Sequence, residues 1–285
     1  MLSLILATFF SANFGIIVRW AQGRRSNLWA VGAINYVCAA LFHLARAFVA
    51  GPSALNTATI LVGIGGGAAF VTAYGFLCAG MAKRGVSIAT AILRLSVLLP
   101  IAVAVIFWDE DPQGWQAAGA ALALVSLPLL AYRPPSPGEV IDKRTIAQLI
   151  VLFVLNGFCM LAIRGYQQTG IRGQESFFLA FLFGTAAIGA IGAWMWQSRR
   201  ARLCTITRRE IGPGVLLGLC NAVGNLTLVQ ALQSLSSVIV FPFQSAVGLI
   251  YVAIFARVAW REQIRHSEAA GMAVALIAVV LINLA

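Results

Sequence analysis

Acidic residues are scarce in this sequence of 285 residues, which holds nine of them against 20 lysines and arginines. Charged residues make up only 10% of the chain, and hydrophobic residues make up 60%. Soluble domains are about a quarter charged and roughly half apolar, so this composition excludes an ordinary soluble domain and indicates a polytopic membrane protein. The basic residues lie mostly in short connections between apolar runs, where they set topology, and we expect no nucleic-acid partner.

Paired cysteines and metal-binding motifs are also missing. The five cysteines are scattered without a CxxC pair, and the whole chain has two histidines. This pattern predicts neither a disulfide framework nor a metal site. The chain also lacks an HExxH motif and a pair of carboxylates inside an apolar run, the groups that a membrane-embedded hydrolase would need. We therefore expect neither an enzyme activity nor a cofactor.

Ten apolar runs are each long enough to cross a hydrocarbon core of roughly 30 Å as a helix. A proline-rich segment, residues 133–145, leaves five runs before it and five after it. We therefore expect an all-α polytopic membrane protein with ten transmembrane helices. The predicted spans are residues 2–20, 28–50, 57–82, 86–107, 114–132, 146–164, 176–196, 211–232, 236–258 and 266–285.

The two halves share a weak internal repeat. The WDE of residues 108–110 and the WRE of residues 260–262 lie at an offset of 152, and each is followed by a similar AAG. A repeat with an odd number of spans must be inverted in the membrane relative to its partner, as in many secondary transporters. We expect a five-helix repeat at residues 1–132, a linker at residues 133–145 and a second five-helix repeat at residues 146–285.

The basic residues are distributed unevenly between the connections. Sixteen of the 20 lie in or next to the connections after odd-numbered spans, three lie in or next to those after even-numbered spans, and one lies near the middle of a span. Cytoplasmic connections of membrane proteins carry the excess of lysine and arginine. We therefore expect the odd-numbered connections in the cytoplasm, both termini outside, and the chain in a bacterial cytoplasmic (inner) membrane.

The fourth predicted span carries a charge, Arg94, near its middle. A charge at that depth costs from about 2.5 to above 10 kcal/mol unless it faces a partner or a water-filled cavity. All nine acidic residues fall in connections or at helix ends, so no intramembrane carboxylate is available. We predict that Arg94 binds an anionic group of a ligand; the alternative is a structural arginine bonded to carbonyls of a broken helix. Pro100, six residues later, removes a backbone donor and predicts such a break.

Gln244 occupies the matching place in the ninth predicted span, flanked by Phe241 and Phe243. If the halves are related by symmetry, Arg94 and Gln244 face each other across a cavity, one supplying charge and the other hydrogen bonds. A helix-packing role is the alternative for Gln244, because amides commonly join helices in membranes. We predict that Pro100, and Pro242 between the two phenylalanines, mark helix breaks that act in gating.

Further polar side chains lie inside the spans. Asn221 and Asn225 are four residues apart and share a helix face, which we expect to line the substrate path. Asn35, and Tyr74 as the repeat counterpart of Asn225, are further candidates for substrate contact, with interhelical packing as the alternative for Asn35. His43 is a candidate proton carrier, with a hydrogen-bonded structural role as the alternative.

The segment SIATAILRLSVLLPIAVAVIFWDE, residues 87–110, recurs more weakly as SSVIVFPFQSAVGLIYVAIFARVAWRE, residues 236–262. Each copy ends in a glutamate, Glu110 or Glu262, and a glycine follows nine residues later. In these features the whole chain resembles the ten-helix EamA-type branch of the drug/metabolite transporter superfamily. The resemblance implies an exporter or exchanger of small metabolites that works by alternating access without ATP hydrolysis. Members are usually drawn with both termini in the cytoplasm, opposite to the charge count.

The charge pattern narrows the expected substrate. A proton-coupled exporter of cationic drugs needs an intramembrane acid, whereas the charge inside a span here is positive. We therefore predict a secondary transporter of anionic or zwitterionic small molecules, amino acids or other carboxylates first, embedded in the lipid bilayer as a monomer or a homodimer. A non-transporting scaffold or an enzyme subunit is the alternative.

Overall fold

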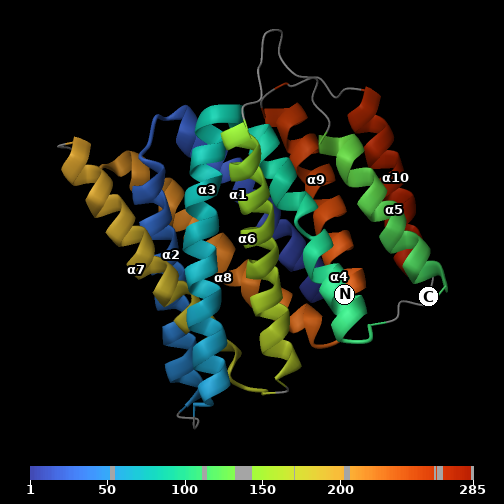
Figure 1. The fold of residues 1–285 in the computed structure, drawn as a ribbon, viewed down its shortest axis with the longest axis horizontal. Helices are drawn as coiled ribbons and strands as arrows, with labels where there is room; N and C mark the ends of the chain where they lie inside the picture. Colours follow the sequence, from blue (N-terminus) through green and yellow to red (C-terminus); the bar gives the residue numbers. More distant parts are fainter. Residues whose placement is uncertain are drawn as a thin grey trace.

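Regular structure in the computed structural model is helical throughout the residues that it describes. These are residues 1–51, 55–110, 114–131, 143–169, 171–201, 206–259, 261 and 266–283, without the side chains of residues 82–91, 116, 128, 130–131, 145, 200–201, 268 and 282–283. Ten helices fall within these ranges (Figure 1). They are α1 Leu2–Gly23, α2 Leu28–Ala50, α3 Thr57–Leu95, α4 Leu98–Phe107, α5 Gly114–Ala131, α6 Lys143–Gln168, α7 Glu175–Ala201, α8 Arg208–Leu232, α9 Ser237–Ala259 and α10 His266–Asn283.

The helices confirm the predicted all-α polytopic architecture. Seven stretches in the described part of the chain are long and apolar enough to cross a membrane, in α1, α2, the first part of α3, α6, α7, α8 and α9. Three shorter apolar stretches, Ile92–Phe107, Ala117–Leu127 and Ala269–Leu281, complete the set. Both the start of α1 and the end of α10 lie at the same side of the bundle, in the lower half of Figure 1.

The third and fourth predicted spans have a different boundary from the one expected. We placed a connection at Lys83 and Arg84, but the backbone stays helical to Leu95, and the interruption comes at Ser96 and Val97. No proline occurs between residues 57 and 99, so nothing removes a backbone donor from this segment until Pro100.

The long helix α3 nevertheless turns back on itself. Gly66 lies against Ala162 of α6, and the Leu93 carbonyl accepts a hydrogen bond from Asn156 of the same helix. Twenty-seven residues of straight helix would separate Gly66 from Leu93 by about 40 Å, whereas their partners on α6 are only about 9 Å apart along its axis. The chain therefore reverses between Gly66 and Leu93, as two separate spans would require, and continues into α4, which packs on α6 and α9 (Figure 1).

Helices of the two halves pack on each other. The main pairs are α2 with α7, α5 with α10, α3 with α6, and α1 with α8, and two further pairs are α2 with α8 and α3 with α7. Fully buried side chains of α7, among them Phe178, Leu182 and Phe183, belong to the main apolar core. In Figure 1, α5 and α10 form one edge of the molecule and α7 forms the opposite edge.

Glycines allow two of these pairs to pack backbone against backbone. A Cβ added to Gly67 of α3 would overlap the carbonyl oxygen of Leu182 in α7. A Cβ added to Gly218 of α8 would lie 2.6 Å from the Cβ of Cys38 and 2.7 Å from the Asn35 carbonyl oxygen in α2. Small residues at membrane helix interfaces permit such close approach, and dispersion contacts then hold the helices together.

The start of α8 is closed by a capping box. Thr207 is the N-cap, and its backbone N–H donates to Oε2 of Glu210 at 2.9 Å. The other oxygen of Glu210 accepts the backbone N–H of Asn27 at 3.2 Å. Glu210 therefore satisfies donors that the helix end leaves free and also ties α8 to the connection between α1 and α2.

Candidate functional site

Arg94 is the second-last residue of α3, six residues before Pro100, and the helix is interrupted between them at Ser96 and Val97. Val97 N–H bonds to the Arg94 carbonyl at 3.5 Å, so the Leu93 carbonyl loses its usual helical donor. Asn156 Nδ2 donates to that carbonyl at 3.1 Å, and Ser96 Oγ donates to it at 2.6 Å. The break is thus satisfied by side chains other than Arg94, which leaves the guanidinium free for another role.

The Arg94 guanidinium packs on the backbone of α9 at Gly248. A Cβ at Gly248 would lie 3.0 Å from Arg94 Nη1 and 3.3 Å from Cζ, so the glycine makes the room for this contact. Within the described part of the chain, the Arg94 side chain has no hydrogen bond and no ion pair, although it is only partly exposed. A partly buried arginine without a partner among the described residues is an energetically costly arrangement that an anionic ligand would relieve.

One stripe of α9 carries Gln244, Gly248 and Tyr251, which are spaced four and three residues apart and share a helix face. Gln244 Nε2 donates to Ser11 Oγ of α1 at 3.2 Å, and the Tyr251 hydroxyl donates to Asn13 Oδ1 at 3.3 Å. Because Arg94 packs on the middle residue of this stripe, the structure brings the predicted pair Arg94 and Gln244 to the same face of α9.

Polar side chains of α8 lie beside this site. Asn221 Nδ2 donates to Oδ1 of Asn35 in α2 at 2.9 Å, and Asn225 Nδ2 donates to the Asn221 carbonyl at 2.9 Å. The neighbouring Gly224 faces the backbone of Ser11 in α1, so this part of α8 and the Gln244 partner are adjacent. Asn35 is fully buried, and its Nδ2 has no partner among the described residues.

The other predicted site residues lie in packed apolar surroundings. Phe241 and Phe243 are buried in the core, and α9 continues as a helix across the buried Pro242. Pro100 is the third residue of α4 and is also buried. A proline in the first turn of a helix loses no internal hydrogen bond, which explains why α4 begins there.

Tyr74 and His43 belong to aromatic clusters away from Arg94. The Tyr74 hydroxyl donates to the Leu28 carbonyl at 2.6 Å, and its ring meets Trp29 edge to face. His43 is fully buried and stacks on Phe183 at 5.7 Å between ring centroids. Neither ring nitrogen of His43 has a hydrogen-bond partner within the described residues.

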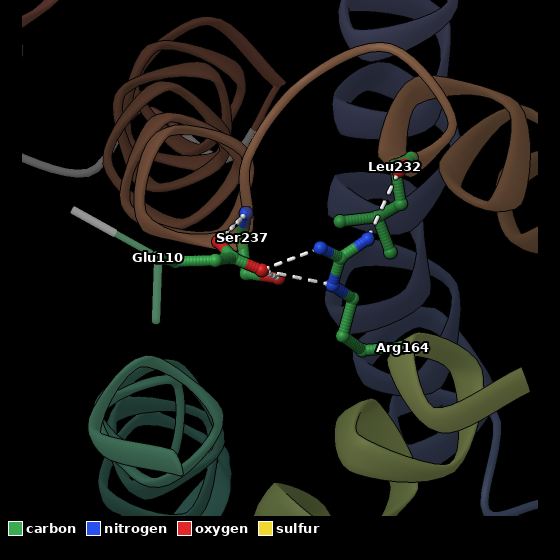
Figure 2. Close-up of polar contacts among 4 residues, drawn as sticks. All are labelled: Glu110, Arg164, Leu232 and Ser237. Atoms are coloured by element: carbon green, nitrogen blue, oxygen red, sulfur yellow. Dashed lines mark hydrogen bonds and ion pairs between the residues drawn. The ribbon is translucent and has the colours of Figure 1, made fainter. Parts of the chain in front are cut away.

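A second polar centre, which the sequence patterns did not predict, joins Glu110 to Arg164 (Figure 2). Arg164 Nε donates to Glu110 Oε1 at 3.0 Å, and Arg164 Nη1 donates to the Leu232 carbonyl at 3.1 Å. Glu110 also accepts the backbone N–H of Ser237 at 2.6 Å and its hydroxyl at 3.0 Å. The sixth predicted span ends at Arg164, but α6 extends to Gln168 and holds Arg164 inside the helix.

Comparison with known proteins agrees with this architecture. The profile of the EamA-like transporter family matches residues 144–284. A solved crystal structure shares the fold with a TM-score of 0.80 at 13% sequence identity, over 99% of this chain and 96% of that chain. A search of curated proteins finds no match to the sequence. The second half of the chain, residues 144–284, belongs to the EamA-like family of transporters, and the long apolar helices mark the protein as an integral membrane protein.

Proposed function

We propose that the protein is a secondary transporter, an exporter or exchanger, of small metabolites that carry a carboxylate, with amino acids and organic acids first among them. The observation that carries the proposal is the Arg94 guanidinium, which lies on Gly248 without a hydrogen bond or an ion pair to any other described residue. A guanidinium presents a planar set of donors that matches a carboxylate with two parallel hydrogen bonds. The ligand would supply the counter-charge that the described chain does not.

Neutral polar groups around Arg94 would orient the rest of the substrate. Gln244 and Ser11 already bond to each other and offer remaining donor and acceptor capacity on the same face of α9. Asn225 on the adjacent helix is partly exposed and extends the polar lining. His43 and Tyr74 are left out of the proposed site, because both are packed among aromatic side chains.

We also propose that the two five-helix halves are inverted repeats, with residues 1–132 and 146–285 as the units. The helix pairs support this: α1 with α8 corresponds to α6 with α3, and α2 with α8 corresponds to α7 with α3. The glycines follow the same relation at an offset of 151, because Gly63 and Gly67 of α3 face α7 while Gly214 and Gly218 of α8 face α2. Two equivalent halves around a central site suit alternating access.

Flux measurements in proteoliposomes test the substrate proposal. A labelled panel of amino acids and organic acids would be assayed with wild type, Arg94→Ala and Arg94→Lys. We expect Arg94→Ala to lower carboxylate flux by about 100-fold, since two charge-assisted hydrogen bonds are lost, and Arg94→Lys to retain part of it. Arg46→Ala, which removes an exposed arginine of α2, is the matched control and should transport like wild type. Unchanged flux in Arg94→Ala would make Arg94 structural and refute the proposal.

We further propose a cytoplasmic-membrane location with both termini outside, from the excess of basic residues in the odd-numbered connections. A C-terminal fusion to alkaline phosphatase should be active, and a fusion to green fluorescent protein at the same end should be dark, because each reporter folds on one side of the membrane. An active phosphatase fused after α7 instead of after α10 would contradict this orientation.

A further inference from the structure

The Glu110–Arg164 pair connects three parts of the chain at one end of the bundle. Glu110 follows α4 in the first half, Arg164 belongs to α6, and their other partners, Leu232 and Ser237, flank the turn between α8 and α9 (Figure 2). Both charged side chains are nearly buried, with relative exposures of 13% for Arg164 and 9% for Glu110. Hydrogen bonds to charged groups in such surroundings are stronger than neutral ones.

Each charge is placed where a helix end favours it. Arg164 bonds to the carbonyl of Leu232, the last residue of α8, where unpaired carbonyls give the helix a partial negative charge. Glu110 bonds to the backbone N–H of Ser237, the first residue of α9, where unpaired N–H groups give a partial positive charge. The pair therefore holds the whole α8–α9 hairpin against α6 and the end of α4.

We propose that the Glu110–Arg164 pair is the latch of a gate at the end of the bundle where α8 turns into α9. This inference rests on the proposed alternating access. A path between the halves opens at this end only if the end of α4 separates from α6 and from the α8–α9 hairpin, which breaks the contacts of Glu110 with Arg164 and Ser237. A variant that lacks these contacts needs less free energy to open this end, so its open state gains population.

The arginine of the pair is not repeated at the matching sequence position of the other half. Under the repeat relation, with offsets of 151 to 152, Glu110 corresponds to Glu262, but Arg164 corresponds to Ala12 or Asn13 of α1. Asn13 carries no charge, and its Oδ1 accepts the hydroxyl of Tyr251. The repeat position of Arg164 in α1 thus carries no arginine.

Distances between spin labels in the full-length protein test the latch without knowledge of the substrate. Labels would be attached through p-acetylphenylalanine at Phe107, which is 72% exposed at the end of α4, and at Ser234, which is exposed in the α8–α9 turn. The native cysteines then remain in place. Pulsed EPR in nanodiscs would compare wild type with Glu110→Gln, Arg164→Gln and the double variant, each checked for helical content and monodispersity.

We expect a longer-distance population that is about tenfold larger in each single variant than in wild type, as loss of a charge-assisted hydrogen bond predicts. The double variant should show no further increase, because both residues act through one contact. Glu210→Gln is the matched control: it also removes a helix-capping glutamate, but that residue serves the start of α8 and has no arginine partner in the described chain. The control should keep the wild-type distances.

Wild-type distances in both folded single variants would overturn the latch, and so would the same long-distance population in Glu210→Gln. If Glu110→Gln does not fold, Arg164→Lys keeps the positive charge without the paired donors and should still enlarge the long-distance population. The flux assay separates the two proposals. A wild type that moves no carboxylate, in a protein whose Glu110→Gln distances lengthen, would refute the substrate assignment and support the latch.

Discussion

Gly67→Ala is expected to destabilise the protein by about 3 kcal/mol or more, or to prevent folding, which is the upper range for overpacking a closely packed interface. The new Cβ would overlap the carbonyl oxygen of Leu182 and would lie 2.7 Å from the Cβ of Thr185. The first of these atoms is backbone in the middle of α7, so it cannot rotate away. Relief requires α3 and α7 to separate, which also loosens the core around Phe183.

Gly65→Ala is the control for this variant in the same helix. A Cβ at Gly65 would meet no atom within 4 Å, so the substitution tests only the exchange of glycine for a better helix former. Thermal unfolding of the detergent-solubilised proteins, followed by circular dichroism and by size-exclusion chromatography, would compare the two. We expect Gly65→Ala to match or slightly exceed wild type. Equal stability of Gly67→Ala and Gly65→Ala would show that α3 and α7 are farther apart than described.

Gly248→Val is expected to reduce carboxylate flux to the level of Arg94→Ala, about 100-fold below wild type, because it removes the geometry needed for paired hydrogen bonds. Even a Cβ at Gly248 would lie 3.0 Å from Arg94 Nη1, and the two methyl groups of valine would extend into the volume of the guanidinium. Arg94 would then keep its charge but lose its position on α9. Gly248→Ala should have a smaller effect, since a shift of a few tenths of an ångström relieves its contact.

A control variant distinguishes displacement of Arg94 from a general loss of stability. Gly192→Val in α7 adds the same side chain where a Cβ meets no atom within 4 Å, and it should transport like wild type. Flux would be measured in proteoliposomes after each variant has been matched for thermal stability. Wild-type flux in a folded Gly248→Val would mean that the position of Arg94 on α9 has no part in transport.

The number of apolar helical segments and the approximate bounds of most of them could be read from the sequence because membrane insertion depends on local properties. An apolar run of sufficient length must form a helix in lipid, since no water is present to satisfy its backbone groups. The predicted α2, Leu28–Ala50, agrees with the structure at both ends. The third and fourth spans are separate apolar stretches as predicted, but the backbone stays helical through Lys83 and Arg84 to Leu95 instead of leaving the helix there.

The candidate site was only partly predictable. Arg94 and Gln244 stood out in the sequence as polar groups in apolar runs, and for Arg94 the cost of burying a charge made the argument independent of tertiary structure. The contact of Arg94 with Gly248 could not be predicted from the sequence, because the role of a glycine depends on which group of another helix packs against it. Asn156 could not be recognised from the sequence either, because its side chain donates to a carbonyl that the end of α3 leaves without its helical donor.

The sequence by itself determined a polytopic helical protein with a charge inside the membrane, because hydrophobicity over some 20 residues and the cost of an unpaired arginine are local quantities. Tertiary structure alone decided which partners meet. Arg164 and Glu110 are 54 residues apart, and no spacing rule joins them. Their pairing depends on how α6, α4 and the α8–α9 hairpin pack, and that packing is set by close contacts between helices rather than by any property of one helix.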